Sequence, residues 1–569
     1  MRRLAATIAV SAGALALPAA ASAHAVLLRT APQASGTVNI APREVALTFS
    51  EAVEPRFAIV SITDAAAHRE TAGAPRRLPA NPDTIVIPLK RIAEGWYLVY
   101  WRVISVDGHP VRGAFTFAVG PNPGPAPQFV IPSISETAAT PKLVAVRWLA
   151  FLTAMVAIGL AALRLAIARP VVRRVPGTSL RPLTVAFAAV SIVGLLAIPA
   201  YLLVATAEFA LRSAFDVGAL VPLVRVSAFG RGVFDLWICF ALYALAAAIA
   251  IRIDRPERPQ RSLAELLALV GAVLAAGAVL LVPGLSGHAA QTSPRGFSLL
   301  FDWTHLAAGS LWLGGLVGLL VLWRSLPSEL RARGLAVAVP RFSNVAFVSV
   351  LVIVASGTAA SLEHLPTVAS LWQTSYGKAI LVKVVLLGLT IPLAAVNLLR
   401  VRPGLVVAAT GEAATRLLRR LVGVEVLLVA GIVLGASVLS SLPPPSKALA
   451  SIGGASAHVG PSRVSRVVKK NGYTFAFQVT PNKAAVPNSF SVHVTKNGVA
   501  VRGAEIVLTF AMLDMEMGNQ AYRLQERAPG TYSRAAPALV MVGHWGLTFS
   551  VTPAGGTAFN VLLVDRANG

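Results

Sequence analysis

His24 directly follows Ala21-Ser22-Ala23, a spacing that can make a histidine the first residue of a mature chain. Residues 1–23 are predicted to be a secretory signal peptide, because Met-Arg-Arg is followed by an apolar run and an Ala-x-Ala cleavage pattern. Cleavage after Ala23 leaves an α-amine and an imidazole on one residue, and the two nitrogens can chelate one ion. Nitrogen ligands favour copper or zinc, with tetragonal Cu(II) the best geometric fit. The alternative is a histidine that follows the cleavage site without binding metal.

Asp107 and His109 are the second pair of candidate ligands. They flank Gly108 after a predicted strand, and residues two apart in an extended segment point to the same side. Together with His24 they can supply one amine, two imidazoles and one carboxylate. Glu51 is expected to support this site by a hydrogen bond to one of the ligands. The alternative is an Asp-Gly turn beside a solvated histidine.

The elements around these ligands predict a small β-sandwich over residues 24–120. Short β-branched or aromatic runs are separated by Pro, Gly and Asn-Pro breaks, as in sandwich domains. The predicted strands include 45–49, 58–62, 84–87 and 95–101. The Pro-rich residues 121–141 are predicted to be a linker.

Residues 142–442 predict an eight-helix membrane domain. The chain is 55% hydrophobic and 13% charged, with a mean hydropathy of +0.69, so much of it must lie in lipid. Eight segments are long enough to span a bilayer, at roughly 143–168, 183–208, 233–251, 262–284, 301–323, 342–361, 379–399 and 421–441.

The basic residues predict the orientation of these helices. The loops after the first, third, fifth and seventh segments are rich in arginine, and the alternate loops contain few basic residues, which places the arginine-rich loops in the cytoplasm. Both terminal domains are then extracytoplasmic, on a multi-pass protein of the inner (plasma) membrane. The basic residues behind the net charge of +25 are thus explained by their role in membrane orientation. Nucleic acid is therefore not an expected partner.

Ionisable residues within or beside the helices are candidates for an ion path, because charge in lipid is costly. The candidates on the extracytoplasmic side are His288, His305, Glu363 and His364. The alternative for each is a hydrogen bond at the interface or between helices. Lys383 and Glu425 lie deeper and are candidates for a structural ion pair, whereas Arg147 and Asp235 are expected to snorkel.

The last part of the chain predicts a second exported β-sandwich over residues 465–569, after a linker at 443–464. It contains four of the six methionines and a histidine that together suit soft Cu(I): Met512, Met515, Met517, Met541 and His544. The alternative is that these methionines fill the core.

Three family resemblances follow from these motifs. His24-Ala-x-Leu, Leu47-Thr-Phe-Ser-Glu-x-Val53 and Ser105-x-Asp-Gly-His-Pro-Val-x-Gly113 resemble CopC, the exported copper-binding domain. The resemblance implies a Cu(II) site in which His24 supplies its amine and ring, with His109 and Asp107 as further ligands. Some CopC proteins also bind Cu(I) in a methionine-rich loop. Residues 24–120 contain no methionine, so that second site is not expected here.

The membrane segments resemble CopD, the copper-resistance membrane protein, and the last domain is similar to YtkA-like domains. The CopD resemblance is carried by Trp312-x-Gly-Gly315, by Phe342-Ser with Ser356-Gly357, and by Thr374-x-Tyr-Gly-Lys378 followed by Lys383. It implies copper movement across the inner membrane, inward. The YtkA-like pattern departs from its family at Val542-Gly-His-Trp545, where a Met-Pro-Gly turn is common.

The sequence therefore predicts a copper-binding and copper-transporting protein rather than an enzyme, and it has no Walker A loop or phosphorylated Asp-Lys-Thr-Gly motif. Its expected partners are the lipid bilayer, copper ions and other copper chaperones. Two alternatives stay open: a membrane oxidoreductase that carries haem and reduces Cu(II) before uptake, and a copper-storage or resistance protein without flux.

Overall fold

The structure, a computed structural model, describes residues 25, 27–34, 36–105, 110–124, 140–210, 218, 220–287, 289, 294–368, 370–407, 411–442, 457–484, 486–513, 520–536, 538–540 and 543–568. The chain divides into two units. One contains the helices of Ala138–Glu363 and Ser375–Leu442, and the other contains both β domains together with His364–Thr374.

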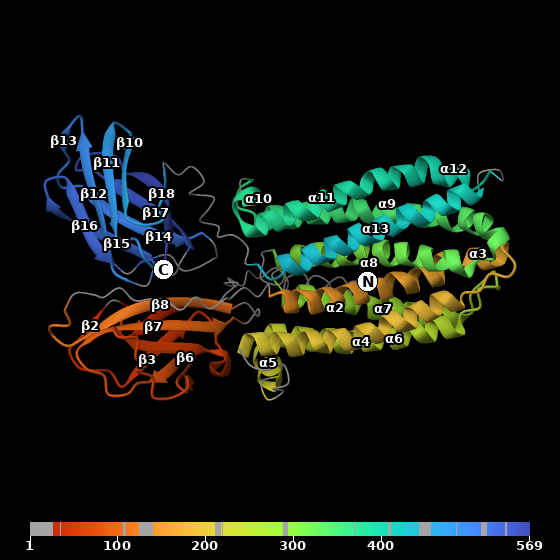
Figure 1. The fold of residues 1–569 in the computed structure, drawn as a ribbon, viewed down its shortest axis with the longest axis horizontal. Coiled ribbons are helices and arrows are strands. Elements are labelled where there is room, and N and C mark those ends of the chain that lie inside the picture. The colour runs from red at the N-terminus through yellow and green to blue at the C-terminus, as the bar shows by residue number, and fades with distance from the viewer. Residues whose placement is uncertain are drawn as a thin grey trace, which may run out of the picture. The chain divides into compact units, whose positions relative to one another are not determined.

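The N-terminal domain is built from two four-stranded sheets, with strand orders β1-β3-β6-β5 and β2-β8-β7-β4 (Figure 1). The four predicted strands are all present, as β3, β4, β6 and β7. The strands are β1 (Leu27–Ala31), β2 (Thr37–Val38), β3 (Glu44–Phe49), β4 (Ile59–Asp64), β5 (Arg76–Leu78), β6 (Asn81–Pro88), β7 (Gly95–Ile104) and β8 (Pro110–Val119).

The hairpin of β7 and β8 holds the loop that contains Asp107 and His109. The two strands pair along their whole length, from Gly95 with Val119 to Ile104 with Pro110. The hairpin is fixed to the core by Trp101, which is 1% exposed and packs edge-on against Phe49 at 5.3 Å between ring centroids. A Cβ at Gly113 would lie 2.6 Å from Trp101 Cζ2, so only glycine fits opposite this ring.

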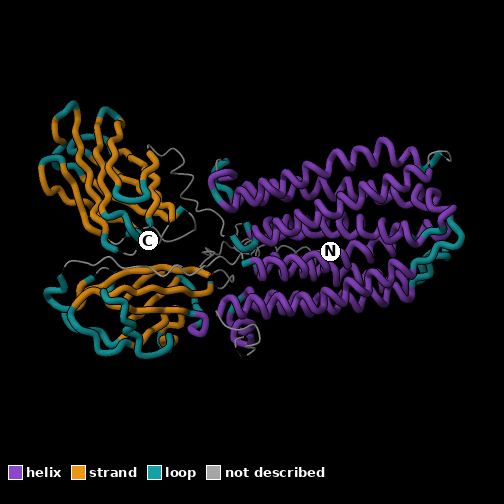
Figure 2. The backbone as a smooth tube through the Cα atoms, viewed as in Figure 1, coloured by secondary structure: helices purple, strands orange, loops and turns teal. Residues whose placement is uncertain are grey.

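The membrane domain contains the eight predicted helices, each apolar and long enough to cross a bilayer (Figure 2). The spans are Pro141–Arg174, Arg181–Phe209, Ala228–Ile253, Leu263–Ser286, Arg295–Ser325, Ser328–His364, Ser375–Gly404 and Gly411–Leu439. The main helices are α2 (Pro141–Ala162), α4 (Arg181–Ala210), α6 (Ala228–Ile253), α7 (Leu263–Ser286), α8 (Arg295–Ser325), α9 (Arg331–His364), α11 (Ser375–Val396) and α13 (Gly411–Leu439). Shorter helices are α3 (Arg169–Arg174), α5 (Leu220–Val226), α10 (Ser370–Gln373) and α12 (Arg402–Gly404).

The helix α2 lies at the centre of this bundle, and α11 lies at its periphery. The most apolar window of the α2 span is 72% buried, and that of the α11 span is only 6% buried. Glycines allow α2 and α8 to approach closely, since a Cβ at Gly159 would lie 2.5 Å from the Cα of Gly314. Small residues at helix contacts are the usual means of close packing in membranes.

The C-terminal domain is a ten-stranded sheet that folds over itself, in the order β10-β11-β12-β16-β15-β14-β17-β18-β9, with β13 paired to β12 (Figure 1). The strand β15 joins the two layers, because it pairs with both β14 and β16. The strands are β9 (Ala457–Val459), β10 (Val464–Lys470), β11 (Tyr473–Thr480), β12 (Asn488–Lys496), β13 (Val499–Ala500), β14 (Glu505–Met512), β15 (Gln520–Ala528), β16 (Thr531–Ala536), β17 (Gly543–Thr552) and β18 (Phe559–Ala567).

Candidate metal sites

The N-terminal ligands His24, Asp107 and His109 lie outside the described residues, but the residues beside them are described. Ala25, directly after His24, is 0% exposed, and its N–H donates to Ser105 Oγ at 3.1 Å. Ser105 precedes Asp107 by two positions and donates its own hydroxyl to Glu51 Oε1 at 2.6 Å. These two hydrogen bonds join the start of the domain to the β7–β8 loop.

Glu51 is therefore bonded to Ser105 at the base of this loop. The sequence predicted that Glu51 supports a ligand directly. The bond that the structure describes is to a neighbour of the ligands, and Ser105 is the intermediate residue that sequence reasoning missed. In the sequence, the one feature that could have pointed to Ser105 is its position at the start of the Ser105–Gly113 motif.

The membrane domain gathers polar residues around His305 in α8. His305 Nδ1 lies 2.9 Å from Ser356 Oγ in α9. Asp302 precedes His305 by three residues and so shares its face of the helix, and Lys383 of α11 acts electrostatically on both side chains. The structure thus brings three polar side chains, Ser356, Asp302 and Lys383, to the neighbourhood of His305.

Lys383 has a different charge partner from the one that the sequence suggested. Glu425 in α13 is 4% exposed and accepts a hydrogen bond from Asn397 Nδ2 at 2.9 Å. The charge that acts on Lys383 is that of Asp302. The predicted Lys383–Glu425 pair is therefore wrong. The helices α11 and α13 do pack together, but Lys383 lies beside Gly435 of α13, ten residues and so about 15 Å along the helix from Glu425.

Arg147 is buried in the bundle and does not snorkel as predicted. It is 3% exposed, and its Nε donates to the Tyr201 hydroxyl at 2.9 Å. Its Nη1 donates to the Ser437 carbonyl and to Ser440 Oγ, both at 3.0 Å, and to Ser441 Oγ. The start of α2 is thereby tied to the end of α13. Asp235 in α6 is exposed, and its snorkelling stays a prediction.

The other candidates for the ion path do not join His305 in a described cluster. Glu363 and His364 end α9, seven and eight residues beyond Ser356 and so about 10 to 12 Å further along the helix. His288 lies outside the described residues. Across the described ranges, no group of three His, Cys, Asp or Glu side chains is close enough to hold a metal ion.

Of the C-terminal candidates, Met512 and His544 are described, and Met515, Met517 and Met541 are not. Met512 is 3% exposed, belongs to the apolar core, and pairs with Trp545 across β14 and β17. His544 precedes Trp545 on its strand and is exposed. Neighbours on a strand point to opposite faces, so Met512 and His544 lie on opposite faces of the sheet.

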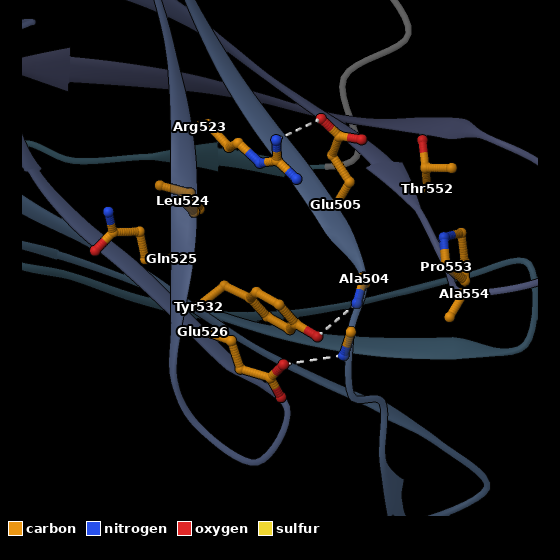
Figure 3. A pocket seen from close by; sticks show the side chains of 11 residues that line it. Ala504, Glu505, Arg523, Leu524, Gln525, Glu526, Tyr532, Thr552, Pro553 and Ala554 are labelled. Atoms are coloured by element: carbon orange, nitrogen blue, oxygen red, sulfur yellow. Dashed lines mark hydrogen bonds and ion pairs between the residues drawn. The ribbon is translucent and has the colours of Figure 1, made fainter.

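The described part of the C-terminal domain also forms an open hollow of about 540 Å³ (Figure 3). Its polar groups bind one another: Arg523 pairs with Glu505 at 3.4 Å, and Glu526 accepts from the N–H of Gly503 at 2.9 Å. The N–H groups of Gly503 and Gly530 lower the pKa of Glu526. The hollow therefore adds no candidate ligand for soft copper.

Family models match four consecutive parts of the chain. They are a CopC domain at residues 27–120, the N-terminal domain of copper resistance protein D-like proteins at 138–296, copper resistance protein D at 336–439 and a YtkA-like domain at 468–550. The matches occur in the order that the sequence motifs predicted.

Individual proteins show the same similarity. The copper transport protein CutJ of Bacillus subtilis (strain 168) is 27% identical over 93% of this chain and 93% of its own length. Protein YobA of Escherichia coli (strain K12) is 36% identical over 17% of this chain and 79% of its own length. The crystal structure of CopC from Methylosinus trichosporium OB3b is 30% identical, covering 18% of this chain and 99% of that chain, with a TM-score of 0.17. The chain belongs to the CopC/CopD copper resistance family, with CopC, CopD and YtkA-like domains in one polypeptide.

Proposed function

We propose that this protein captures Cu(II) outside the plasma membrane through its N-terminal domain and moves copper into the cytoplasm through its helices. The observation that carries the proposal is the Ala25–Ser105–Glu51 chain of hydrogen bonds. It holds the residue after His24 against the loop that contains Asp107 and His109. A ligand set of the His24 amine and ring, the Asp107 carboxylate and the His109 ring requires this proximity.

The chemistry of these groups suits a capture site. One amine, two imidazoles and a carboxylate are ligands that favour Cu(II) over soft Cu(I). Glu51 acts through Ser105, since it accepts the serine hydroxyl while Ser105 Oγ accepts from Ala25. This arrangement fixes the backbone of Ala25, the residue that directly follows His24.

The proposed path then runs past His305, with His288, Glu363 and His364 on the same predicted side of the membrane. Asp302 adds a carboxylate one helical turn from His305, and Lys383 supplies a nearby positive charge. Intramembrane ionisable residues of this kind commonly mark ion pathways. Cytoplasmic delivery follows from the proposed orientation, with both terminal domains outside.

The C-terminal domain is proposed to hold Cu(I) through Met515, Met517, Met541 and His544. Thioether sulfur and one imidazole suit the soft ion. Met512 is left out of this set, because it packs in the apolar core on the face opposite His544.

Copper accumulation in cells tests the proposed route. Wild type is compared with His24→Ala and His305→Ala, and with a chain that carries one extra residue ahead of His24 after cleavage. Each change is expected to lower accumulation, because each removes or displaces a ligand, and the added residue should weaken Cu(II) binding at least about 10-fold.

Two substitutions serve as controls for that experiment. His68→Ala removes an exposed histidine of the N-terminal domain whose ring bonds to Asp64, and Thr304→Ala changes the residue beside His305 in α8. Both should accumulate copper like wild type. Unchanged accumulation in His24→Ala and His305→Ala would rule out the route, and a Soret band in the purified protein would favour the haem oxidoreductase instead.

A further inference from the structure

The hydrogen bond between His305 and Ser356 joins α8 to α9 at the proposed ion path. His305 Nδ1 and Ser356 Oγ are 2.9 Å apart, and Ser356 is 4% exposed. A neutral imidazole carries its proton on either Nδ1 or Nε2, and the partner of one nitrogen decides which. The proton of the Ser356 hydroxyl therefore determines which nitrogen of His305 remains free.

The Ser356 hydroxyl donates its proton to its own helix. Its Oγ lies 2.5 Å from the Val352 carbonyl and 3.4 Å from the Ile353 carbonyl, and carbonyl oxygens only accept. A hydroxyl has one proton, so toward His305 the Ser356 oxygen acts as an acceptor. Nδ1 of His305 must then carry the hydrogen, and Nε2 retains its lone pair.

A metal ion binds histidine through the ring nitrogen that keeps its lone pair, and ligating histidines usually donate their other ring N–H to a fixed acceptor. The surroundings of the ring suit this use. A Cβ at Gly357 would lie 3.4 Å from Cε1, the ring carbon between the two nitrogens, which is ordinary contact distance, so the backbone of α9 at Gly357 lies close beside the ring. Asp302 supplies a carboxylate one turn away on the same helix.

We infer that Ser356 is a positioning residue, which fixes His305 as the Nδ1–H tautomer so that Nε2 binds copper during its passage. The inference rests on the proposed route through His305, and it assigns the atom that takes the ion. Ser356 itself does not bind the metal. Its loss is expected to lower copper affinity at His305 by about 10-fold, the lower end of what a residue behind a metal ligand contributes.

The test measures the tautomer and the transport separately, on the full chain. Solid-state NMR of the protein with ¹⁵N-labelled histidine distinguishes a protonated ring nitrogen from a bare one, and the His305 signals are assigned by their loss in His305→Gln. Wild type and Ser356→Thr, which keeps the hydroxyl, should show Nδ1–H at His305. Ser356→Ala should show a mixture of tautomers.

Uptake at limiting copper is measured for the same variants. Ser356→Ala should lose about 10-fold, and Ser356→Thr should retain most of the activity. Ser361→Ala is the matched control on α9, since this hydroxyl donates to the Gly357 carbonyl at 2.7 Å, and it should behave like wild type.

The two measurements separate failure of this inference from failure of the proposed function. If wild-type His305 carries its proton on Nε2, the inference is overturned and the route through His305 still stands on its own test. If Ser356→Ala changes the tautomer without changing uptake, the tautomer does not matter for transport and the inference is overturned, whereas the route itself falls only if His305→Ala also leaves accumulation unchanged.

Discussion

Asp565 shows how a single buried carboxyl can remain partly unsatisfied in the core of the C-terminal domain. It is 0% exposed, and its Oδ1 accepts from Asn482 Nδ2 at 2.9 Å. Within the described ranges, Asp565 Oδ2 and Asn482 Oδ1 are buried with no hydrogen-bond partner. Burial raises the pKa of the Asp565 carboxyl, although the Asn482 bond opposes the shift. A buried acceptor without a donor usually destabilises a fold.

Asp565→Asn is therefore expected to stabilise the C-terminal domain at neutral pH, by about 1–2 kcal/mol. The new amide can donate to Asn482 Oδ1 and still accept from Asn482 Nδ2. Folding raises the pKa of this carboxyl in the wild-type domain. The contribution of Asp565 to stability is therefore greatest below the ordinary pKa of 3.8 and is lost as the pH rises through the pKa of the folded state. Hydrogen exchange of β17 and β18 in the full chain should show this gain at pH 7 and not in acid.

The same stabilisation at pH 3 and pH 7, or a loss at pH 7, would contradict this account of Asp565. Asp83→Asn is a suitable control, because Asp83 lies in the N-terminal domain and should leave exchange in β17 and β18 unchanged.

At the scale of elements, a buried ionic cluster ties the π-helical turn after α2 and the start of α3 to the segment between α6 and α7. Arg164 Nη1 and Arg169 Nη1 each lie 2.7 Å from a different oxygen of Asp254. Arg169 also lies 3.4 Å from Glu265, whose carboxylate caps the start of α7 by accepting from the N–H of Ser262. The side chains of Arg164, Arg169 and Asp254 are at most 8% exposed.

Asp254→Asn should strongly destabilise the membrane domain, because it leaves two buried guanidinium groups with one less counter-charge. Removing one partner of a buried ion pair costs about 3–5 kcal/mol. The control is Glu412→Gln, which breaks a pair with Arg416 whose side chains are 65% and 90% exposed, and which should cost about 0.5 kcal/mol or less. Unfolding of the purified protein in denaturing detergent measures both, and equal effects would show that the cluster does not hold the helices together.

At the scale of the whole molecule, arginine-rich loops predict which ends of the helices face the cytoplasm. Cys239 is the chain's one cysteine, so Cys239→Ser gives a background for site-directed labelling. In that background Ser179→Cys, in the loop between α3 and α4, should react only with membrane-permeant thiol reagents. Val368→Cys, after α9 and 72% exposed, should react with impermeant reagents on intact cells. The opposite pattern would reverse the proposed orientation and exclude capture of copper from outside.

The sequence by itself determined the order of domains, the eight membrane helices and four of the N-terminal strands, β3, β4, β6 and β7. These features depend on local patterns. An apolar run long enough to span lipid indicates a membrane helix, and alternation of apolar and polar residues indicates a half-buried strand, whichever elements pack beside them. The motifs that carry the CopC, CopD and YtkA-like resemblances were also readable, because each is a short stretch of sequence, and the metal ligands proposed within them stay a prediction.

The tertiary structure decided which side chains meet. His305 and Ser356 are 51 positions apart, Lys383 is acted on by Asp302 rather than Glu425, and Arg147 is buried against the end of α13. Met512 is likewise separated from His544 by the pairing of β14 with β17. Each outcome depends on which helices or strands become neighbours, on the rotation of each about its axis and on how far each is shifted along that axis. That choice is made by the packing of the whole core, which no local pattern in the chain encodes.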